Sequence, residues 1–248
     1  MTDGDVLQLE LRSQRLTRDK RGRNCWQVLT GARTVPAERA ALLLCDVWDD
    51  HHCRGAVERL EAMLPRMNEL VGAARAMGVH IIHAPSDTMD FYADAPARRR
   101  ILEIEPVEPP PEIDHADPPQ PVDASDGGSD TEDTGDQPWT RQHPAIDVDQ
   151  DRDVISDVGR EVYSYLQCEG IELLLITGVH TNMCVQHRSF AIKQMVHWGV
   201  SVALVRDLTD TMYNPAMPPY VSHEEGTRLV VEFIEKFWCP SITSNQIV

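Results

Sequence analysis

The sequence predicts an α/β protein in which a mainly parallel central sheet is covered by helices on both faces. Apolar runs typical of buried strands alternate with segments of helical period four or more times along the chain. These apolar runs end abruptly in polar residues, as buried parallel strands do at the edge of a sheet. Ligands of such sheets bind beyond the carboxyl ends of the strands, so functional side chains are expected there.

The individual elements follow from this pattern. The first buried strand is "ALLLCDVW", residues 41–48, which stops at "DDHH". Apolar residues then recur at helical spacing until Gly78 ends the helix. The remaining predictions, in order, are a helix over 56–77, strands over 79–85 and 153–156, a helix over 158–170, a strand over 171–179, a helix over 182–198, a strand over 200–208 and a helix over 224–237.

Two segments do not fit the alternation. Residues 103–137 contain twelve acidic residues and seven prolines but no Lys or Arg, so they bury too little apolar surface to form a packed unit. We interpret them as an inserted loop, partly extended and mobile, which either keeps the protein in solution or acts as a substrate lid or partner-binding arm. Residues 1–37 are interpreted as an irregular or hairpin extension, and residues 38–248 as one domain that carries the insertion.

Composition excludes several classes of partner. The formal net charge of −17 argues against nucleic-acid binding, which requires a basic surface. No apolar run reaches the roughly 18 to 20 residues of a membrane span, and the acidic start "MTDGDVLQLE" is unlike a signal peptide. The six cysteines lack CxxC spacing, which favours reduced thiols over disulfides or structural zinc. We therefore expect a cytoplasmic protein with small-molecule or protein partners.

Two reactive side chains follow predicted strands. Asp46 lies at the end of the first strand, and Cys184 comes shortly after "IELLLITGV", where a helix is expected to begin. A helix N-terminus stabilises a thiolate, and a nearby carboxylate can accept the thiol proton. Taken singly, the aspartate could be a helix cap and the cysteine a small core residue. Their shared position at the carboxyl ends of strands favours a catalytic pair.

Three segments together resemble the isochorismatase-like cysteine hydrolases, a family that includes nicotinamidases and N-carbamoyl amidases. They are "LLLCDVWDD", "ITGVHTNMCV" and "VALVRDLTDT", and the resemblance covers roughly residues 38–237. It implies a three-layer Rossmann-like fold and hydrolysis of a C–N bond in a small amide or carbamoyl-type substrate. In the implied mechanism Cys184 forms a covalent thioester and Asp46 transfers the proton. The resemblance also implies a cis peptide between Val179 and His180, with the N–H groups of His180 and Cys184 forming an oxyanion hole.

The third catalytic residue of the family, a lysine, has no counterpart in the expected region, because residues 138–177 contain no lysine. Arg141 is the expected replacement as a fixed positive charge, and His143 is the competing candidate. Lys193 lies on the helix after the nucleophile, where a solvated role is expected. The missing lysine leaves open a second hypothesis, in which the protein has lost catalysis and acts as a binding or assembly protein through its acidic insertion.

The remaining expectations concern the pocket, metals and assembly. Trp48, His52, Asp87 and His143 are expected to line the substrate pocket. Some relatives bind a divalent metal, and "DDHHC" and "HAPSD" invite that comparison, but the second segment lacks Asp-x-His spacing. We therefore expect no metal and no cofactor. The family forms oligomers, so a homo-oligomer is expected. Residues 211–223 and 236–245 are candidates for its contacts, and burial of these residues within the subunit is the alternative.

Overall fold

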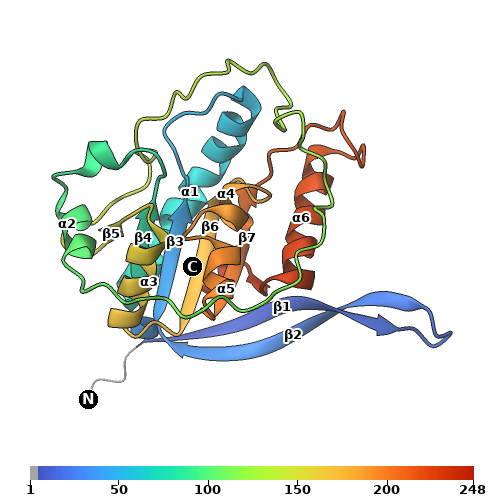
Figure 1. Cartoon of the computed structure of the whole chain (residues 1–248), viewed down its shortest axis with the longest axis horizontal. Coiled ribbons are helices and arrows are strands. Elements are labelled where there is room, and N and C mark those ends of the chain that lie inside the picture. Colours follow the sequence, from blue (N-terminus) through green and yellow to red (C-terminus); the bar gives the residue numbers. More distant parts are fainter. Residues whose placement is uncertain (1–4) are drawn as a thin grey trace.

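An eight-stranded sheet runs through the molecule in the order β2-β1-β8-β7-β6-β3-β4-β5 (Figure 1). The structure is a computed structural model that describes residues 5–248. Wherever two of the strands β3 to β8 are neighbours, they run parallel. Strand β1 runs antiparallel to both β2 and β8. The strands are β1 (Val6–Arg18), β2 (Asn24–Pro36), β3 (Ala40–Cys45), β4 (His80–Ala84), β5 (Val154–Ile155), β6 (Leu173–Val179), β7 (Val202–Asp210) and β8 (Ser241–Ile242).

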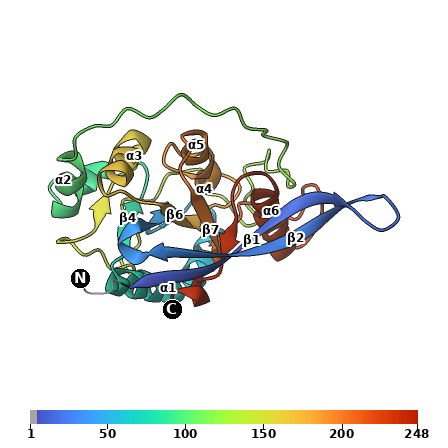
Figure 2. The ribbon, with the colours of Figure 1, turned by 90° about the horizontal axis from the view of Figure 1, so that it is seen from below.

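Helices cover both faces of this sheet. The long helix α1 packs on one face, whereas α3, α5 and α6 pack on the other (Figure 2). This arrangement confirms the predicted three-layer fold with a mainly parallel sheet. The helices are α1 (Arg54–Met77), α2 (Pro96–Leu102), α3 (Gly159–Cys168), α4 (Cys184–His187), α5 (Ile192–His197) and α6 (His223–Phe237), with short 3-10 turns at Ala37–Arg39, Met89–Tyr92 and Ser244–Gln246.

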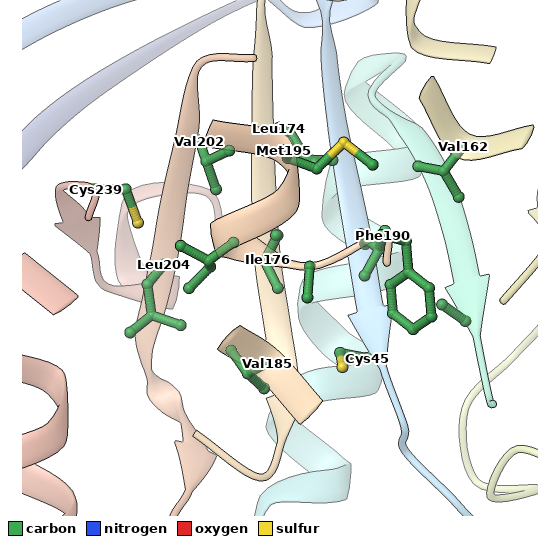
Figure 3. Packing of buried hydrophobic residues seen from close by; sticks show 14 of the residues in the cluster. Cys45, Val162, Leu174, Ile176, Val185, Phe190, Met195, Val202, Leu204 and Cys239 are labelled. Atoms are coloured by element: carbon green, nitrogen blue, oxygen red, sulfur yellow. The ribbon is translucent and has the colours of Figure 1, made fainter. Parts of the chain in front are cut away.

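Strand β3 shows how the sheet separates two cores. Because successive side chains point to opposite faces, Leu43 and Cys45 pack with α3 and α5, whereas Leu42 and Leu44 pack with α1. Figure 3 shows the first of these cores, in which Phe190 lies among the strand side chains. Each fully buried Leu or Ile contributes about 1.5 to 3 kcal/mol relative to exposure. The apolar runs seen in the sequence are thus the centre of the fold.

The segment after Cys184 differs from the prediction. The sequence predicts one helix over 182–198, but the structure contains two short helices, α4 and α5. Arg188 leaves the helical conformation with φ −61° and ψ 152°. The break is fixed by tertiary contacts, because the Gly159 N–H at the start of α3 donates to the Ser189 hydroxyl at 2.9 Å and Phe190 is fully buried. Elements α2 and β8 were also not anticipated.

The amino-terminal residues form a long β-hairpin. Strands β1 and β2 pair along their whole length, from Val6 opposite Pro36 to Arg18 opposite Asn24. Only Arg12 pairs with the rest of the sheet, opposite Ser241 of β8. The base of the hairpin belongs to the core, whereas its tip projects beyond α6 (Figure 2).

Residues 103–137, here called the acidic strap, contain neither a helix nor a strand. They run outside α3 and α5 and then along α6 (Figures 1 and 2). Polar contacts attach them along the way: the Ile113 N–H donates to the His197 carbonyl at 2.8 Å, and Asp117 pairs with Lys193 at 2.7 Å. The strap is therefore an extended segment attached to the body at several points.

Candidate active site

Asp46 lies at the carboxyl end of β3 and is fully buried. Its backbone has a positive φ of 49°, and its N–H donates to the Ala84 carbonyl at 3.0 Å. One carboxylate oxygen accepts from the Ser86 N–H at 2.8 Å, and the other accepts from Arg188 Nε at 2.9 Å. These contacts lie far from the start of α1 at Arg54, so Asp46 does not act as a helix cap.

Cys184 is the first residue of α4, and its thiol lies close enough to the Asp46 carboxylate for each group to shift the pKa of the other. The chain reaches it from β6 through Gly178, which has φ 110° and lies against β3. A side chain at Gly178 would place its Cβ only 2.0 Å from the Cys45 carbonyl oxygen, so glycine is required there. The following peptide, Val179–His180, is cis, as the family resemblance implied.

Two backbone N–H groups remain available beside the thiol. The His180 N–H faces the Cys184 sulfur, and within residues 5–248 neither His180 nor Cys184 donates its N–H to another protein group. Thr181 is different, because its N–H donates to the Asp210 carbonyl at 2.8 Å. The loop therefore presents two free donors on the side where the thiol lies.

The thiol is protonated in the resting site. Burial and the adjacent Asp46 carboxylate raise the pKa of Cys184 to about 12, although Arg188 and the His180 N–H act in the opposite direction. Burial also raises the pKa of Asp46 above its usual value, and Arg188 and Ser86 offset part of that effect. The start of a four-residue helix thus does not by itself produce a resting thiolate. A raised carboxyl pKa does make Asp46 a stronger base toward the thiol.

Arg188, which the sequence analysis did not single out, is the cation that contacts Asp46. It lies in the break between α4 and α5, and it also bonds Asp87 through Nη2 at 3.1 Å. Burial opposes its charge, but Asp46 and Cys184 outweigh burial and raise the Arg188 pKa, so the guanidinium stays charged. The only signal available in the sequence was its position four residues after Cys184.

The structure does not bring Arg141 to Asp46. Its guanidinium lies 3.7 Å from the Asp49 carboxylate and 5.5 Å from the centre of the Phe91 ring, and it is about half exposed. Arg141 contributes its backbone instead, because its carbonyl accepts from the Asp49 N–H at 3.0 Å. The expected charge beside Asp46 is therefore supplied from a different part of the chain.

The two other candidates are also engaged elsewhere. The His143 ring accepts through Nδ1 from the Ala145 N–H at 3.1 Å, and the backbone N–H of His143 donates to the Val47 carbonyl at 2.7 Å. Lys193 is largely buried and pairs with Asp117 of the acidic strap, so its expected solvated position is wrong.

A narrow cleft lies beside Asp46, and a cluster of aromatic rings forms one side of it, with Trp139 packed behind the lining residue Trp48. The Trp48 and Trp139 rings stack with their centres 4.3 Å apart, and the His51 ring is nearly parallel to Trp139 at 5.6 Å. The His180 ring meets His51 edge-on at 4.8 Å. The residues that line the cleft are Asp46, Trp48, Asp49, Asp50, His51, Ala56, Val57, Leu60, Glu61, His143, Val179 and His180.

The imidazoles on this side of the cleft are uncharged at neutral pH. Burial and the neighbouring His52 lower the pKa of His51 to about 4, and burial together with His51 lowers that of His180 to about 3. The aromatic side of the cleft therefore carries no positive charge, and Asp46, Asp49, Asp50 and Glu61 supply carboxyl groups to the rest of its lining.

Cys184 and Arg188 line a second, open hollow together with Asn182, Met183 and His187. Of the four residues expected in the pocket, Trp48 and His143 line the cleft. His52 lies 3.0 Å from Asp133 of the strap, and Asp87 is largely exposed beside Arg188. Neither of these two lines the cleft or the open hollow. His51 lines the cleft in the place expected for His52.

No metal site is formed by the part of the chain that the structure describes. Among residues 5–248, no three His, Cys, Asp or Glu side chains are arranged to hold an ion. His51 and His52 stack on each other with ring centres 4.0 Å apart, and Asp87 is bound to Arg188. The side chains of "DDHHC" and "HAPSD" that invited comparison with a metal site thus contact other protein groups.

A buried ionic cluster supports the nucleophile loop from behind. Asp210, at the end of β7, accepts from Arg59 of α1 at 2.9 Å and lies 2.9 Å from His223 of α6. Asp130 of the acidic strap completes the cluster at 2.7 Å from Arg59. Since Asp210 also accepts the Thr181 N–H, the cluster connects α1, α6, the strap and the loop that precedes Cys184.

Comparisons with known proteins agree with this fold. The Isochorismatase domain family model matches residues 40–216. Among solved structures, a cysteine hydrolase from Pseudomonas syringae pv. phaseolicola aligns with a TM-score of 0.53 and 16% identity, covering 86% of this chain and 92% of that chain. A putative isochorismatase from Burkholderia xenovorans aligns with a TM-score of 0.51 and 18% identity, covering 84% and 85% of the two chains.

An isochorismatase from Pseudomonas putida aligns with a TM-score of 0.52 and 13% identity, covering 86% of this chain and 91% of that chain. At these identities the structural neighbours show the fold alone. No curated protein sequence matches the chain.

Proposed function

Because the chain belongs to the isochorismatase family, we propose that it is a cysteine hydrolase that cleaves the C–N bond of a small amide or carbamoyl compound. The observation that carries the proposal is the position of the buried Asp46 carboxylate, which accepts from the Arg188 guanidinium at 2.9 Å and lies near enough to the Cys184 thiol to raise its pKa. These three groups supply a nucleophile, a proton carrier and a fixed positive charge.

The first half of the reaction forms the thioester. Asp46 takes the Cys184 proton as the sulfur attacks the substrate carbonyl carbon, and the oxyanion that forms accepts from the N–H groups of His180 and Cys184. The C–N bond then breaks. Asp46 gives its proton to the departing nitrogen, which leaves as ammonia or an amine.

The second half releases the acid. A water molecule attacks the thioester carbonyl while Asp46 accepts one of its protons. Collapse of the second tetrahedral intermediate expels the Cys184 sulfur, which recovers a proton from Asp46. Nucleophile and proton carrier thus return to their starting states.

Arg188 acts in this scheme through its charge. Its guanidinium cannot readily donate a proton, so every proton transfer passes through Asp46. When Asp46 is protonated, the negative charge moves to the sulfur, which Arg188 also stabilises. The positive charge thus has an anionic partner before and after the thiol loses its proton.

The substrate class is supported by the charges that line the cleft, because Asp46, Asp49, Asp50 and Glu61 are acidic and the aromatic side carries no positive charge. His51 and His180 are uncharged at pH 7, and Trp48 and Trp139 are aromatic, so this side provides no cation for an anionic substrate. A small uncharged acyl group fits this lining better than a carboxylate. We propose that the cleft binds the acyl part and the open hollow receives the leaving amine.

The test is a hydrolysis screen with nicotinamide, carbamoyl compounds, biuret-like ureas and small aryl amides. The wild-type protein should hydrolyse at least one class and form an acyl adduct on Cys184, detected by mass spectrometry after acid quenching. Cys184→Ala should show neither while unfolding at a similar temperature. Arg188→Gln should lose about 10²-fold or more in kcat, as for loss of one charged stabiliser, whereas Arg141→Gln serves as the matched control and should change little.

Two outcomes would refute parts of this proposal. Turnover by Cys184→Ala at the wild-type level would exclude the covalent route. Equal losses in Arg141→Gln and Arg188→Gln would remove the assignment of Arg188. A wild-type protein that binds these compounds without cleaving them would instead favour a family member that has lost catalysis.

The cellular setting is part of the proposal. All six cysteines are free, and Cys25 and Cys168 are exposed, which suits a reducing compartment. Among the helices of residues 5–248, none has the length and apolar character needed to cross a bilayer. We propose that the enzyme works in the cytoplasm.

A further inference from the structure

Charge is unevenly distributed over this acidic chain. The distal half of the hairpin, residues 13–29, here called the basic arm, has five basic residues and one acidic residue. Arg23 pairs with Asp19 at the tip, but Arg15, Arg18, Lys20 and Arg21 form no ion pair within residues 5–248. The net charge of the whole chain is −17, so the arm is a positive projection from a negative molecule.

The basic arm also exposes apolar side chains. Leu16 and Trp26 lie opposite each other in the β-ladder with 52% and 40% of their surface exposed, and Val28 follows on the same face with 49%. Only the inner edge of this face is covered, where Trp26 meets Phe237 of α6 edge-on at 5.5 Å. Strand β2 is an edge of the sheet, so its outer backbone groups are unpaired as well.

The acidic strap carries the complementary pattern. Of its twelve carboxylates, eight form no ion pair within the described residues, and Glu103, Glu105 and Asp114 are among these eight. Exposed apolar side chains lie among them, with Val107 39% exposed and Ile113 55% exposed. The strap and the arm thus carry opposite charge, and both expose apolar side chains.

The arm and the strap of one molecule do not meet. No hydrogen bond or ion pair joins residues 13–29 to residues 103–137 within the described chain, and Figure 2 shows the arm projecting beyond α6 while the strap crosses outside α3 and α5. Strand β1 continues for six residues past its pairing with the body at Arg12, a reach of roughly 20 Å at strand spacing.

We propose that the basic arm of one copy docks on the acidic strap of a second copy. Charge complementarity selects this occupant, because both surfaces are present on every molecule and opposite charges on them attract. A two-fold arrangement would form the contact twice, with each arm on the other copy's strap. Such an interface is held largely by exposed charges and weakens as salt screens them.

Charge reversal tests the proposal. The arm variant combines Arg15→Glu, Arg18→Glu and Arg21→Glu, and the strap variant combines Glu103→Lys, Glu105→Lys and Asp114→Lys. Arg152→Glu is the control, because Arg152 is an exposed arginine that bonds the Arg75 carbonyl at 3.0 Å, outside both the arm and the strap. Sedimentation velocity at about 10 μM protein compares low salt with about 0.5 M salt, where the Debye length is only a few ångströms.

The wild-type protein and the control should be dimers in low salt and shift toward monomers in high salt. Each reversed variant alone should be a monomer. The net charge of the arm changes from +4 to −2 in the arm variant, and in the strap variant the four unpaired carboxylates of residues 103–117 become three lysines and Glu112, so in either variant the two surfaces carry the same sign. An equimolar mixture of the two variants should restore the dimer, because both contacts then join opposite charges. Circular dichroism confirms that each variant is folded.

Three results would overturn the proposal. The first is a wild-type protein that is monomeric in low salt, which would leave the arm for a different acidic partner. The second is a dimer that persists in either reversed variant. The third is a mixture of the two variants that stays monomeric.

Discussion

At Asp46, one buried carboxylate meets three groups that compete for its charge. The Ser86 N–H and Arg188 favour the ionised form, whereas the Cys184 thiol lies ready to give up a proton to it. Burial opposes ionisation, and the net result is a carboxyl pKa above its usual value. In the proposed mechanism the same balance keeps the thiol protonated until substrate arrives.

This balance predicts that turnover and thiol reactivity respond to Asp46→Asn in opposite directions. Loss of the carboxylate removes the proton acceptor, so turnover should fall by at least about 10²-fold. It also removes the negative charge that raises the pKa of Cys184, so alkylation of this thiol at pH 8 should become faster. Iodoacetamide labelling followed by peptide mass spectrometry measures the second effect, with the buried Cys239 as internal control.

A slower alkylation in Asp46→Asn would mean that Asp46 activates the resting thiol rather than suppressing it. In that case the order of proton transfer proposed above would be wrong.

Among the elements, the junction of β6 with β3 is the most constrained. Gly178 has a positive φ and no room for a Cβ beside the Cys45 carbonyl. Gly178→Ala should therefore cost more than about 4 kcal/mol in the free energy of unfolding, in the range that marks a severe steric conflict. Gly72→Ala on α1 is the control, because nothing lies within 4 Å of its Cβ position, and it should gain about 0.5 to 1 kcal/mol.

Urea denaturation gives both values. A Gly178→Ala protein that unfolds near the parent midpoint would show that the β6–β3 junction can shift to accommodate a methyl group.

The elements also differ in how well the sequence predicts them. Strands β3 and β6 were predictable because Leu42 to Leu44 and Leu173 to Ile176 form uninterrupted apolar runs that stop at polar residues. The break between α4 and α5 was not, because residues 184–197 contain no glycine or proline and their apolar spacing continues through it. Contacts with α3 produce the break, and such contacts leave no local signal.

The lack of a local signal for tertiary contacts also explains why Asp46 and Cys184 were predicted but Arg188 was not. Asp46 and Cys184 could be found because strand ends of a parallel sheet share one edge. Arg188 reaches Asp46 only because the helix stops at that residue, so a search along the expected region led to Arg141 instead. The acidic composition of the strap likewise predicted an extended segment but not its attachment to Lys193 and Arg59.

On the scale of the whole molecule, the ionic cluster behind the nucleophile loop joins four distant segments. Burial opposes the charge of His223, but its pairing with Asp210 raises the pKa of the imidazole overall. Burial likewise opposes the charge of Asp210, yet His223 and Arg59 lower the pKa of that carboxyl. The cluster is therefore most stabilising when the histidine is protonated and the aspartates are ionised.

The sign of the pH dependence follows from these shifts. The contribution of His223 is complete below the unfolded histidine pKa of about 6.5 and is lost as pH rises through its higher folded value. The contribution of Asp210 is present above about pH 4 and is lost as pH falls below that. The free energy of unfolding should thus decrease between about pH 6 and pH 9.

The check is urea unfolding of the wild-type protein and His223→Gln at these two pH values. His223→Gln should lose about 1 to 3 kcal/mol at pH 6, as expected when a buried partner is left unsatisfied, and should show a smaller decrease toward pH 9. An equal decrease in both proteins would assign the pH dependence to other groups.

The arginine in the catalytic centre has a consequence for side reactions. A thioester is an acyl donor, and a primary amine held beside it can capture the acyl group permanently as an amide. A guanidinium stays protonated at physiological pH and is a poor nucleophile, so Arg188 can remain next to the acylated Cys184 without being modified. In the proposed mechanism, a guanidinium rather than a primary amine beside Asp46 therefore protects the enzyme from inactivation by its own intermediate, while it leaves Asp46 as the single carrier of protons.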